Sequence, residues 1–337
     1  MKFIDLFAGI GGFRLGMESA GHECVAFCEI DKFARASYKA IHNTEGEIEL
    51  HDITQVTDDE IRNIGHVDAI CGGFPCQAFS IAGRRRGFED TRGTLFFEIA
   101  RFASILKPKY LFLENVKGLL NHDKGNTFEV ILSALDELGY DVEWQVLNSK
   151  DFGVPQNRER VFIIGHLRGE RGRKVFPLGG NGAPIDCEQQ KINKVGNIRK
   201  KGKTQSGDVV SVGISPTLNT MQGGGRQPKI RVREATKQGY AEASVGDSVN
   251  LSHPNSKTRR GRVGDGIANT LVTGDSQGVV TPNFRIRKLT PRECWRLQGF
   301  PDWAFDKAQE VNSNSQLYKQ AGNSVTVNVI KEIARYL

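Results

Sequence analysis

A cysteine, Cys76, lies in a turn whose residue types suit a nucleophile. The turn reads Gly-Gly-Phe-Pro-Cys-Gln over residues 72–77 and follows a short apolar run. Pro75 fixes the backbone angle next to the thiol, and the glycines permit a close approach to it. A free thiol is only a few per cent thiolate at neutral pH, so a catalytic one needs nearby positive charge or amide groups. The alternative is that Cys76 is a small core side chain.

A carboxyl group and two arginines could act together with this thiol. Glu114 and Asn115 follow a predicted strand, so both side chains can project into the same cleft, where a carboxyl could serve as a general acid. Arg158 and Arg160 belong to the polar run 156–160, which precedes another predicted strand. The alternative for this run is a solvated face.

A glycine turn after the first predicted strand indicates a nucleoside-binding site. Gly9, Gly11 and Gly12 form this turn, and Glu29 ends the second predicted strand, where an acidic side chain would bind ribose hydroxyls. Arg14 stands where the dinucleotide pattern G-x-G-x-x-G has its third glycine, so the turn is less suited to a pyrophosphate. The prediction is a nucleoside cofactor, and the alternative is a tight strand–helix turn.

The elements that must position these residues alternate between strands and helices. Apolar runs bounded by turn residues predict the strands, and helical spacing predicts the helices. This alternation indicates βαβ units, hence an α/β fold with a doubly wound, mostly parallel sheet that binds ligands beyond the carboxyl ends of its strands. The predicted strands are 2–7, 23–29, 67–71, 109–114 and 161–166, and the predicted helices are 13–20, 31–41, 94–106, 127–138 and 323–336.

Charge and texture set one third of the chain apart. Residues 168–290 hold 22 Lys and Arg against 9 Asp and Glu, whereas the whole chain of 337 residues has a net charge of only +7. This block reads as short strands and loops, and its charge is typical of a surface that binds nucleic acid. The alternative is a solvated basic surface. Two octamers in it, residues 213–220 and 266–273, share five of eight residues, which indicates either paired strand–turn units or chance.

Composition excludes several other classes of protein. Hydrophobic residues make up 38% of the chain, enough for a core and too many for wholesale disorder. Apolar runs stay below the roughly 18 residues of a membrane helix, and Asp5 and several glycines interrupt the apolar N-terminus, which argues against a signal peptide. The six cysteines form no C-x-x-C pair, which argues against zinc and disulfides and favours a reducing cytoplasm.

Together these motifs resemble the bacterial DNA cytosine-5 methyltransferases, which use S-adenosyl-L-methionine. The resemblance runs nearly from end to end, and only the basic block lacks a strong match. Its motifs are, in chain order, the glycine turn at 5–13, Glu29, Asp52, Phe-Pro-Cys-Gln at 74–77, Glu-Asn-Val at 114–116, the polar run at 156–160, the segment at 287–293 and Gln-Ala-Gly-Asn-Ser-Val at 320–325.

The resemblance implies methyl transfer to carbon 5 of a flipped-out cytosine in a specific short duplex site. Cys76 would add to carbon 6 of the ring, Glu114 would protonate or hydrogen-bond N3, and Arg160 would bind the O2 side. Asn115 and Arg158 would support this pocket. S-adenosyl-L-methionine would become S-adenosyl-L-homocysteine, with no metal involved. The implied cofactor-binding residues are Phe7, Gly9, Gly11, Gly12, Glu29, Ile30, Asp52, Ile53, Pro75, Leu95 and Asn323.

The resemblance also implies two domains. Residues 1–175 and 307–337 would form the catalytic, S-adenosylmethionine-binding (Rossmann-like) domain. Residues 176–306 would form a smaller, β-rich target-recognition domain with a hinge segment at 287–306. Glycines and a run of three arginines predict that residues 80–93 form a lid, and the alternative is a floppy basic loop. The cations of this segment and of the basic block predict the DNA-binding residues, with a solvated face as the alternative; they are Ser80, Arg84, Arg85, Arg86, Arg226, Lys257, Arg259, Arg260 and Arg262.

Double-stranded DNA is the expected partner, and no membrane is expected to be one. The protein is expected to bind DNA as a monomer in the cytoplasm. The setting would be a restriction–modification system with a cognate endonuclease, or an orphan or phage methylase. Three alternatives compete with this hypothesis. A nicotinamide-dependent oxidoreductase would leave the Cys76 loop and the basic block unexplained. An RNA methyltransferase of the transfer-RNA type usually has Cys-Phe-Thr, and no cysteine here precedes Phe. A non-enzymatic relative would be expected to lose Cys76 or Glu114.

Overall fold

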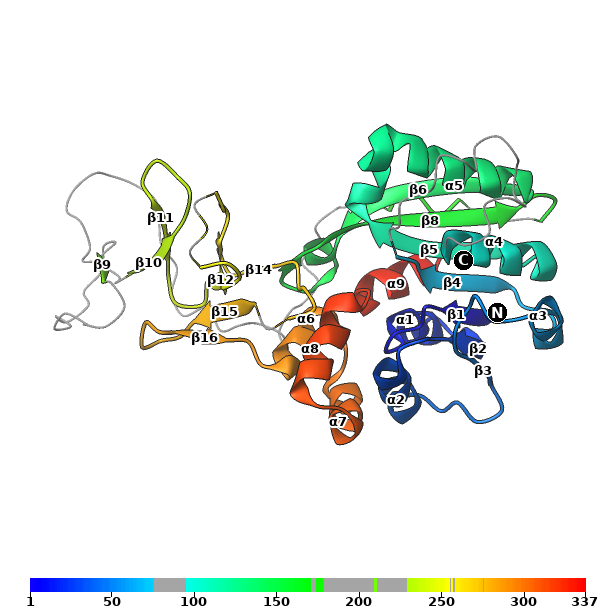
Figure 1. Ribbon diagram of the computed structural model, residues 1–337, viewed down its shortest axis with the longest axis horizontal. Coiled ribbons are helices and arrows are strands. Elements are labelled where there is room, and N and C mark those ends of the chain that lie inside the picture. Colours follow the sequence, from blue (N-terminus) through cyan, green and yellow to red (C-terminus); the bar gives the residue numbers. More distant parts are fainter. Residues whose placement is uncertain are drawn as a thin grey trace.

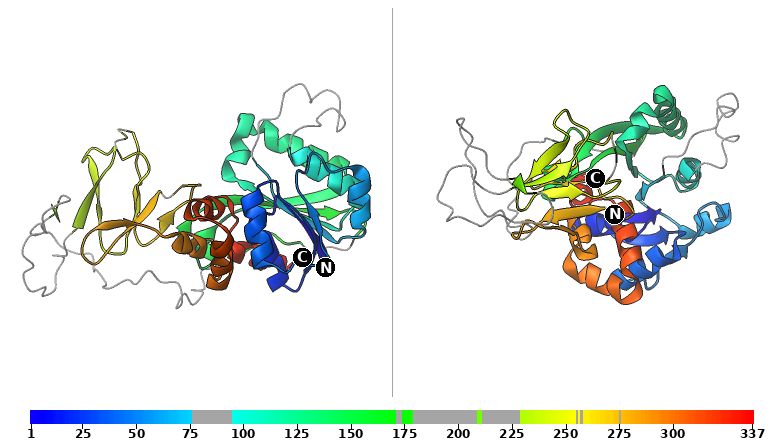
Figure 2. Two further views of the ribbon diagram at one scale, coloured as in Figure 1. Left: turned by 60° about the horizontal axis from the view of Figure 1, so that its bottom comes forward. Right: turned by 60° about the vertical axis from the view of Figure 1, so that its left-hand side comes forward.

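The chain folds into a large α/β part and a smaller part rich in strands. The computed structural model describes residues 1–75, 95–170, 174–178, 209–210, 229–254, 256, 258–274 and 276–337. Figure 1 shows that the large part carries both termini and that strands β9 to β16 gather at the other end of the molecule. The first view in Figure 2 shows the same two parts side by side.

A seven-stranded sheet forms the centre of the large part, in the order β3-β2-β1-β4-β5-β8-β6. Neighbours from β3 to β5 pair in parallel, whereas β8 runs antiparallel to both β5 and β6. This confirms the predicted α/β fold with a mostly parallel sheet. The strands are β1 (Lys2–Leu6), β2 (Glu23–Cys28), β3 (Ile48–Leu50), β4 (Ala69–Gly73), β5 (Tyr110–Val116), β6 (Tyr140–Asn148) and β8 (Glu159–Leu167).

The edge of the sheet beyond β5 differs from simple βαβ alternation. The strand predicted at 161–166 is β8, which is antiparallel to β5. β8 runs antiparallel because the additional strand β6 precedes it in the chain. The sequence pattern did not reveal β6, because this edge strand alternates apolar with polar residues and is only half-buried. Only the short 3₁₀ helix η4 (Ser149–Phe152) and β7 (Gln156–Asn157) lie between β6 and β8, too little for a parallel crossover.

Helices cover both faces of the sheet, as a doubly wound fold requires. One apolar core joins the strands to α3, α4 and α5 on one face, and a second joins them to α1 and α9 on the other, where Tyr38 of α2 also stacks on Phe27. Local caps fix several helix starts: Asp31 accepts hydrogen bonds from two backbone N–H groups of α2, and Thr57 forms a capping box with Glu60 at α3. These helices are α1 (Gly12–Ser19), α2 (Lys32–Ile41), α3 (Asp58–Ile64), α4 (Leu95–Leu106), α5 (Asn126–Glu137) and α9 (Val327–Ala334), with the 3₁₀ helix η3 (Lys117–Gly125) before α5.

The single C-terminal helix predicted at 323–336 is wrong. Asn323 instead ends α8 (Asn314–Asn323), and α9 begins only at Val327. Ser324 between them is extended, with ψ at 156°, and its carbonyl oxygen accepts a hydrogen bond from the Arg158 guanidinium at 2.8 Å. A helical Ser324 would point that oxygen along the helix axis, so a partner far away in the sequence explains the break.

Three helices before this break share a core with the sheet part. Residues of α6 (Pro291–Leu297), α7 (Asp302–Val311) and α8 pack around Trp295, and Ile10 and Ile41 belong to the same cluster. Residues 291–306, which the sequence assigned to the hinge segment, therefore already pack against elements of the large part. The domain limits near 175 and 307 stay predictions.

The small part consists of short strands in small sheets. One has the order β11-β10-β9, a second the order β13-β12-β15-β16, and β14 pairs with β7 of the large part. Ile230, Val232 and Val249 contribute to its small apolar core. The second predicted octamer contains β14, and the first lies outside the described residues. The strands are β9 (Val209–Val210), β10 (Lys229–Arg233), β11 (Tyr240–Ala243), β12 (Ser248–Asn250), β13 (Val263–Gly264), β14 (Ala268–Asn269), β15 (Gln277–Val280) and β16 (Ile286–Lys288).

Among the described residues, no helix has the length and apolar character needed to span a membrane.

Candidate active site

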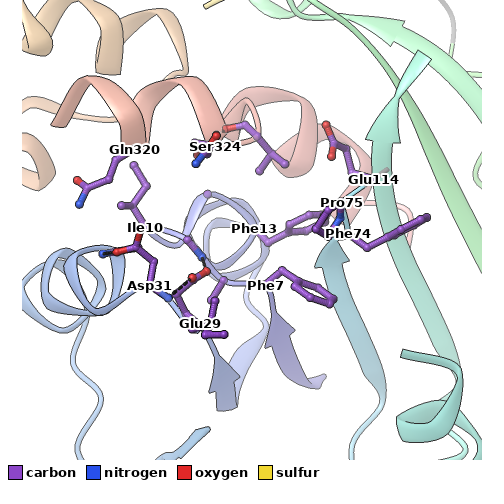
Figure 3. Close-up of a pocket in the computed structure, with 18 of the residues that line it drawn as sticks. Phe7, Ile10, Phe13, Glu29, Asp31, Phe74, Pro75, Glu114, Gln320 and Ser324 are labelled. Carbon is purple, nitrogen blue, oxygen red and sulfur yellow. Dashed lines mark hydrogen bonds between the residues drawn. The ribbon is translucent and has the colours of Figure 1, made fainter. Parts of the chain in front are cut away.

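A cavity of about 490 Å³ opens at the carboxyl ends of β1, β2, β4 and β5, with the end of α8 as its far wall. Such an edge is where open α/β sheets bind ligands. Figure 3 shows Glu29 and Asp31 at one side of this cavity, and Glu114 with Phe74 and Pro75 at the other. The cavity therefore has two polar ends, which are described in turn.

The glycine turn and Glu29 form the first end. Phe7 and Gly9 both have positive φ angles, of 55° and 56°, so the chain doubles back directly after β1. The Glu29 carboxylate accepts hydrogen bonds from the Gly9 N–H and from the Asp31 N–H, each at 2.8 Å. Burial raises the pKa of Glu29, although these two N–H groups and other contacts act against the rise. Glu29 thus ties the glycine turn to the start of α2.

Two further acidic groups lie at this end. Asp52 follows β3 and its Oδ1 accepts hydrogen bonds from the backbone and the hydroxyl of Thr54. Asp31 forms an ion pair with Lys319 of α8 at 2.6 Å across the rim of the cavity. The sequence motifs did not indicate Asp31 and Lys319, because these two residues lie far apart in the chain; only the motif at 320–325 could have pointed to this part of α8.

Most of the predicted cofactor residues line the cavity, and Gly11 does not. The lining includes Phe7, Gly9, Gly12, Glu29, Ile30, Asp52, Ile53, Pro75, Leu95 and Asn323. Gly11 has a φ of 83°, and a Cβ atom there would lie 2.0 Å from Nε2 of His42. The close contact with His42 explains why glycine stands at this place in the motif, and cofactor binding by Gly11 stays a prediction.

Glu114 forms the second polar end of the cavity. It lies near the end of β5, is only 7% exposed, and Arg160 Nε lies 3.0 Å from its Oε1. Burial raises the pKa of Glu114, whereas the charges of Arg160 and Arg158 lower it. Gly73 on the neighbouring strand leaves the room for this carboxyl, since a Cβ atom there would lie 3.1 Å from Glu114 Oε2. A buried carboxyl beside two guanidinium groups can hold or give up a proton.

Asn115 holds the chain just before the predicted nucleophile. Its Nδ2 donates a hydrogen bond to the Phe74 carbonyl oxygen at 2.8 Å, and its Oδ1 accepts from the Val116 N–H. Pro75 lines the cavity next to Phe74. Cys76 itself lies outside the described residues.

Arg158 is buried between the two parts of the structure. It is 3% exposed and donates hydrogen bonds to the carbonyl oxygens of Gly322 and Ser324, at 3.2 and 2.8 Å. Burial and the nearby charge of Arg160 together lower the pKa of Arg158 to about 9, against the opposing charge of Glu114. Arg158 therefore holds the backbone on both sides of Asn323, which lines the cavity.

The residues predicted to contact DNA are only partly described. Arg260 is exposed and donates to the Ala235 carbonyl oxygen at 2.8 Å, and Arg259 is half-buried in the same loop. Arg262 is only 5% exposed, and its guanidinium donates to the carbonyl oxygens of Ser252 and His253, each at 2.7 Å. The Arg262 guanidinium therefore holds the loop together from inside, and its contact with DNA stays a prediction. Ser80, Arg84, Arg85, Arg86, Arg226 and Lys257 lie outside the described residues.

No group of three or more metal-ligating side chains occurs among the described residues.

Comparison with known proteins finds a matching family, similar sequences and similar folds. The family described as C-5 cytosine-specific DNA methylase matches residues 1–337. The type II methyltransferase M.HhaI of Haemophilus parahaemolyticus is 39% identical and covers 99% of this chain and 93% of its own length. The orphan methyltransferase M.SPRI of Bacillus phage SPR is 35% identical and covers 100% and 97%. In fold, the chain is similar to a crystal structure of a prophage-encoded protein from E. coli, with a TM-score of 0.63, 23% identity and coverage of 99% and 97%.

Proposed function

The chain belongs to the C-5 cytosine-specific DNA methylase family, and on this premise we propose that it transfers a methyl group from S-adenosyl-L-methionine to carbon 5 of cytosine in a specific short site of duplex DNA. The observation that carries the proposal is the pairing of two polar ends in one cavity. Glu29 and Asp52 lie at one end and Glu114 with Arg160 at the other. A nucleoside-based methyl donor and a target base would meet between them.

The first end of the cavity fits S-adenosylmethionine. The whole cavity measures about 490 Å³, which is in the range of pockets for ligands of this size. Each Glu29 oxygen accepts one backbone N–H and keeps a lone pair for a ribose hydroxyl. Phe7 would lie against the adenine ring, and Asp52 would accept from its amino group. When bound, S-adenosylmethionine supplies an electrophilic methyl group.

Cys76 is proposed as the nucleophile that activates the cytosine. Carbon 5 of cytosine is a poor nucleophile, and addition of the Cys76 thiolate to carbon 6 makes it enamine-like. After carbon 5 has gained the methyl group, a base removes its proton and the Cys76 thiolate leaves, which restores the aromatic ring. Asn115 supports this role, because its hydrogen bond to the Phe74 carbonyl oxygen fixes the backbone two residues before Cys76.

Glu114 is proposed to act on N3 of the same ring. Its raised pKa favours the protonated carboxyl, which donates to N3 and withdraws electrons from carbon 6 as the thiolate adds. Arg160 orients this carboxyl and would bind the O2 side of the ring. Removal of Glu114 should therefore affect addition at carbon 6 far more than cofactor binding.

Substrate access requires that the cytosine leave the duplex. The target carbon is buried in the base stack, so the nucleotide must be flipped out at a cost of roughly a few kcal/mol. The small part and the basic block would supply the DNA contacts that offset this cost. We propose that the chain acts as a monomer in the cytoplasm. Because orphan and type II enzymes both occur among its relatives, its activity would not require a cognate endonuclease.

The proposal is tested by labelled methyl transfer from S-adenosylmethionine to unmethylated duplex DNA, with transfer RNA as a parallel substrate. We expect label in the DNA for the wild type and for Cys294→Ala, whose cysteine is buried in α6 and does not line the cavity. Cys76→Ser should transfer none. Label in transfer RNA alone would favour the RNA methyltransferase alternative, and near-normal DNA methylation by Cys76→Ser would overturn the role of the thiol.

A further inference from the structure

One segment of the small part is docked on the polar run that carries the arginines of the active site, and it contacts Arg158. Residues 266–273 are the second predicted octamer, and their strand β14 pairs in parallel with β7, with Ala268 opposite Gln156 and Asn269 opposite Asn157. β7 continues straight into Arg158 and Arg160. Figure 1 shows β14 leading from the strand-rich end of the molecule toward the large part.

The side chain of Gln156 binds this segment in a fully buried position. Gln156 is 0% exposed, and its Oε1 accepts a hydrogen bond from the Leu271 N–H at 3.0 Å. Its Nε2 donates to the Leu297 carbonyl oxygen at 2.8 Å and lies 3.4 Å from Gln298 Oε1. An N–H on one side and carbonyl oxygens on the other fix the orientation of the amide. Gln156 therefore joins the docked segment to α6.

Arg158 contacts the carbonyl oxygen of Leu271, the residue whose N–H donates to Gln156. Its guanidinium lies 3.4 Å from the Leu271 carbonyl oxygen and also donates to the carbonyl oxygens of Gly322 and Ser324. These two residues flank Asn323 in the wall of the cavity. Alternate side chains of the run thus link these parts: Gln156 and Arg158 contact the docked segment, Arg158 also contacts the cavity wall, and Arg160 contacts Glu114.

The docked segment and the cavity wall also touch backbone to backbone. A Cβ atom on Gly322 would lie 2.4 Å from the Val272 carbonyl oxygen and 2.7 Å from the Thr273 nitrogen. No side chain fits between them, so any displacement of residues 271–273 must move the wall or break the hydrogen bonds of Gln156. Well-packed contacts of this kind transmit a shift rather than absorb it.

We propose that Gln156 is a positioning residue that couples the small part to the active site. By holding Leu271, it makes the cavity wall and the Arg158–Arg160 run respond to DNA bound by the small part. Binding of the target duplex then tightens cofactor binding and aligns Glu114, although Gln156 touches neither ligand. This inference rests on the proposed function and adds a residue that the motif roles did not include.

Gln156→Met tests the coupling, because methionine has a similar shape and makes none of these hydrogen bonds. On a duplex carrying the wild-type methylation site, kcat should fall about tenfold, the order expected for one lost buried hydrogen bond. Binding of S-adenosylhomocysteine without DNA should stay within about twofold of the wild type, since Gln156 is not part of the cavity lining. The tightening of that binding by the target duplex should disappear.

Gln145→Met is the matched control. Like Gln156, Gln145 accepts from one backbone N–H and donates to one backbone carbonyl oxygen, here the N–H and the carbonyl oxygen of Leu178 at 2.9 and 3.3 Å, but it lies on β6 away from the docked segment. It should keep both the wild-type kcat and the tightening of cofactor binding by DNA.

Thr270→Val keeps the test decisive if Gln156→Met does not fold. Its hydroxyl donates to the Asn157 carbonyl oxygen at 2.7 Å at a partly exposed place, so the change removes one contact of the same seam. We expect about a threefold loss both in kcat and in the tightening of S-adenosylhomocysteine binding by the target duplex. Wild-type coupling in Thr270→Val and in any folded Gln156→Met, or an equal loss in Gln145→Met, would overturn the inference while the proposed function stands. A wild-type protein that methylates no DNA would overturn both.

Discussion

Glu29→Ala should weaken binding of S-adenosylmethionine strongly while leaving a folded protein. In the structure the Glu29 carboxylate lies at the end of β2 and accepts the N–H groups of Gly9 and Asp31, each at 2.8 Å. Alanine removes the group proposed to bind the ribose, and it also releases the glycine turn from α2. Both effects lower the affinity for the nucleoside.

The magnitude follows from the hydrogen bonds that are lost. A hydrogen bond to a charged group contributes about 1.5–3 kcal/mol. Burial of Glu29 raises its pKa, so part of this gain already offsets the cost of keeping the carboxylate charged. We therefore expect a loss of about 1–3 kcal/mol in binding, which corresponds to about 5- to 150-fold in Kd.

Calorimetric titration of S-adenosylmethionine into the wild type, Glu29→Ala and Glu23→Ala measures this loss. Glu23 begins the same strand at its far end and is exposed, so it controls for loss of a carboxylate on β2. Thermal unfolding of each variant separates binding from stability. An unchanged affinity in Glu29→Ala, or tighter binding of a nicotinamide nucleotide than of S-adenosylmethionine by the wild type, would refute the assignment.

Further predictions address the reaction, the stability of the protein and its binding to DNA. Cys76→Ser should abolish methyl transfer and keep S-adenosylmethionine affinity within about threefold, as measured by calorimetry, because only the covalent step is lost. Arg160→Gln removes a charge that lowers the pKa of Glu114, so Glu114 keeps its proton to higher pH and the basic limb of the kcat–pH profile should move to higher pH; an unmoved limb would contradict the role of Glu114 as proton donor. Since the folded pKa of Glu114 lies above its ordinary value of 4.5, its contribution to stability is full below that pH and is lost as pH rises through the folded value. If Arg259 contacts a phosphate, Arg259→Gln should reduce the slope of log DNA affinity against log salt concentration by about one unit. Arg262→Gln should mainly lower Tm, because the Arg262 guanidinium donates hydrogen bonds to the loop carbonyl oxygens.

Sequence periodicity predicted the parts of the site that lie at strand ends. Glu29 and Glu114 each lie at or near the carboxyl end of a parallel strand, and such ends meet at one edge of a sheet whatever the intervening chain does. The cavity therefore brings both carboxyl groups together, as alternation of strands and helices predicts. Sequence periodicity therefore predicts at which edge of the sheet a residue lies.

Partners distant in the sequence were not predictable in the same way. Arg262 lies in a run whose composition predicts DNA contacts. The sequence could not show that its guanidinium donates to the loop carbonyl oxygens of Ser252 and His253, or that its backbone N–H donates to the Glu234 carboxylate. The break between α8 and α9 likewise depends on Arg158, which reaches the Ser324 carbonyl oxygen from another element. Tertiary partners of this kind override local helix signals.

Bisulfite sequencing of unmethylated DNA after treatment with the purified protein and S-adenosylmethionine tests the central claim most directly. The account predicts that cytosines in one short duplex sequence become protected from conversion by the wild type and by Cys294→Ala, and that Cys76→Ser protects none. Complete conversion of every cytosine after treatment with the wild-type protein, or protection that is unchanged in Cys76→Ser, would contradict it.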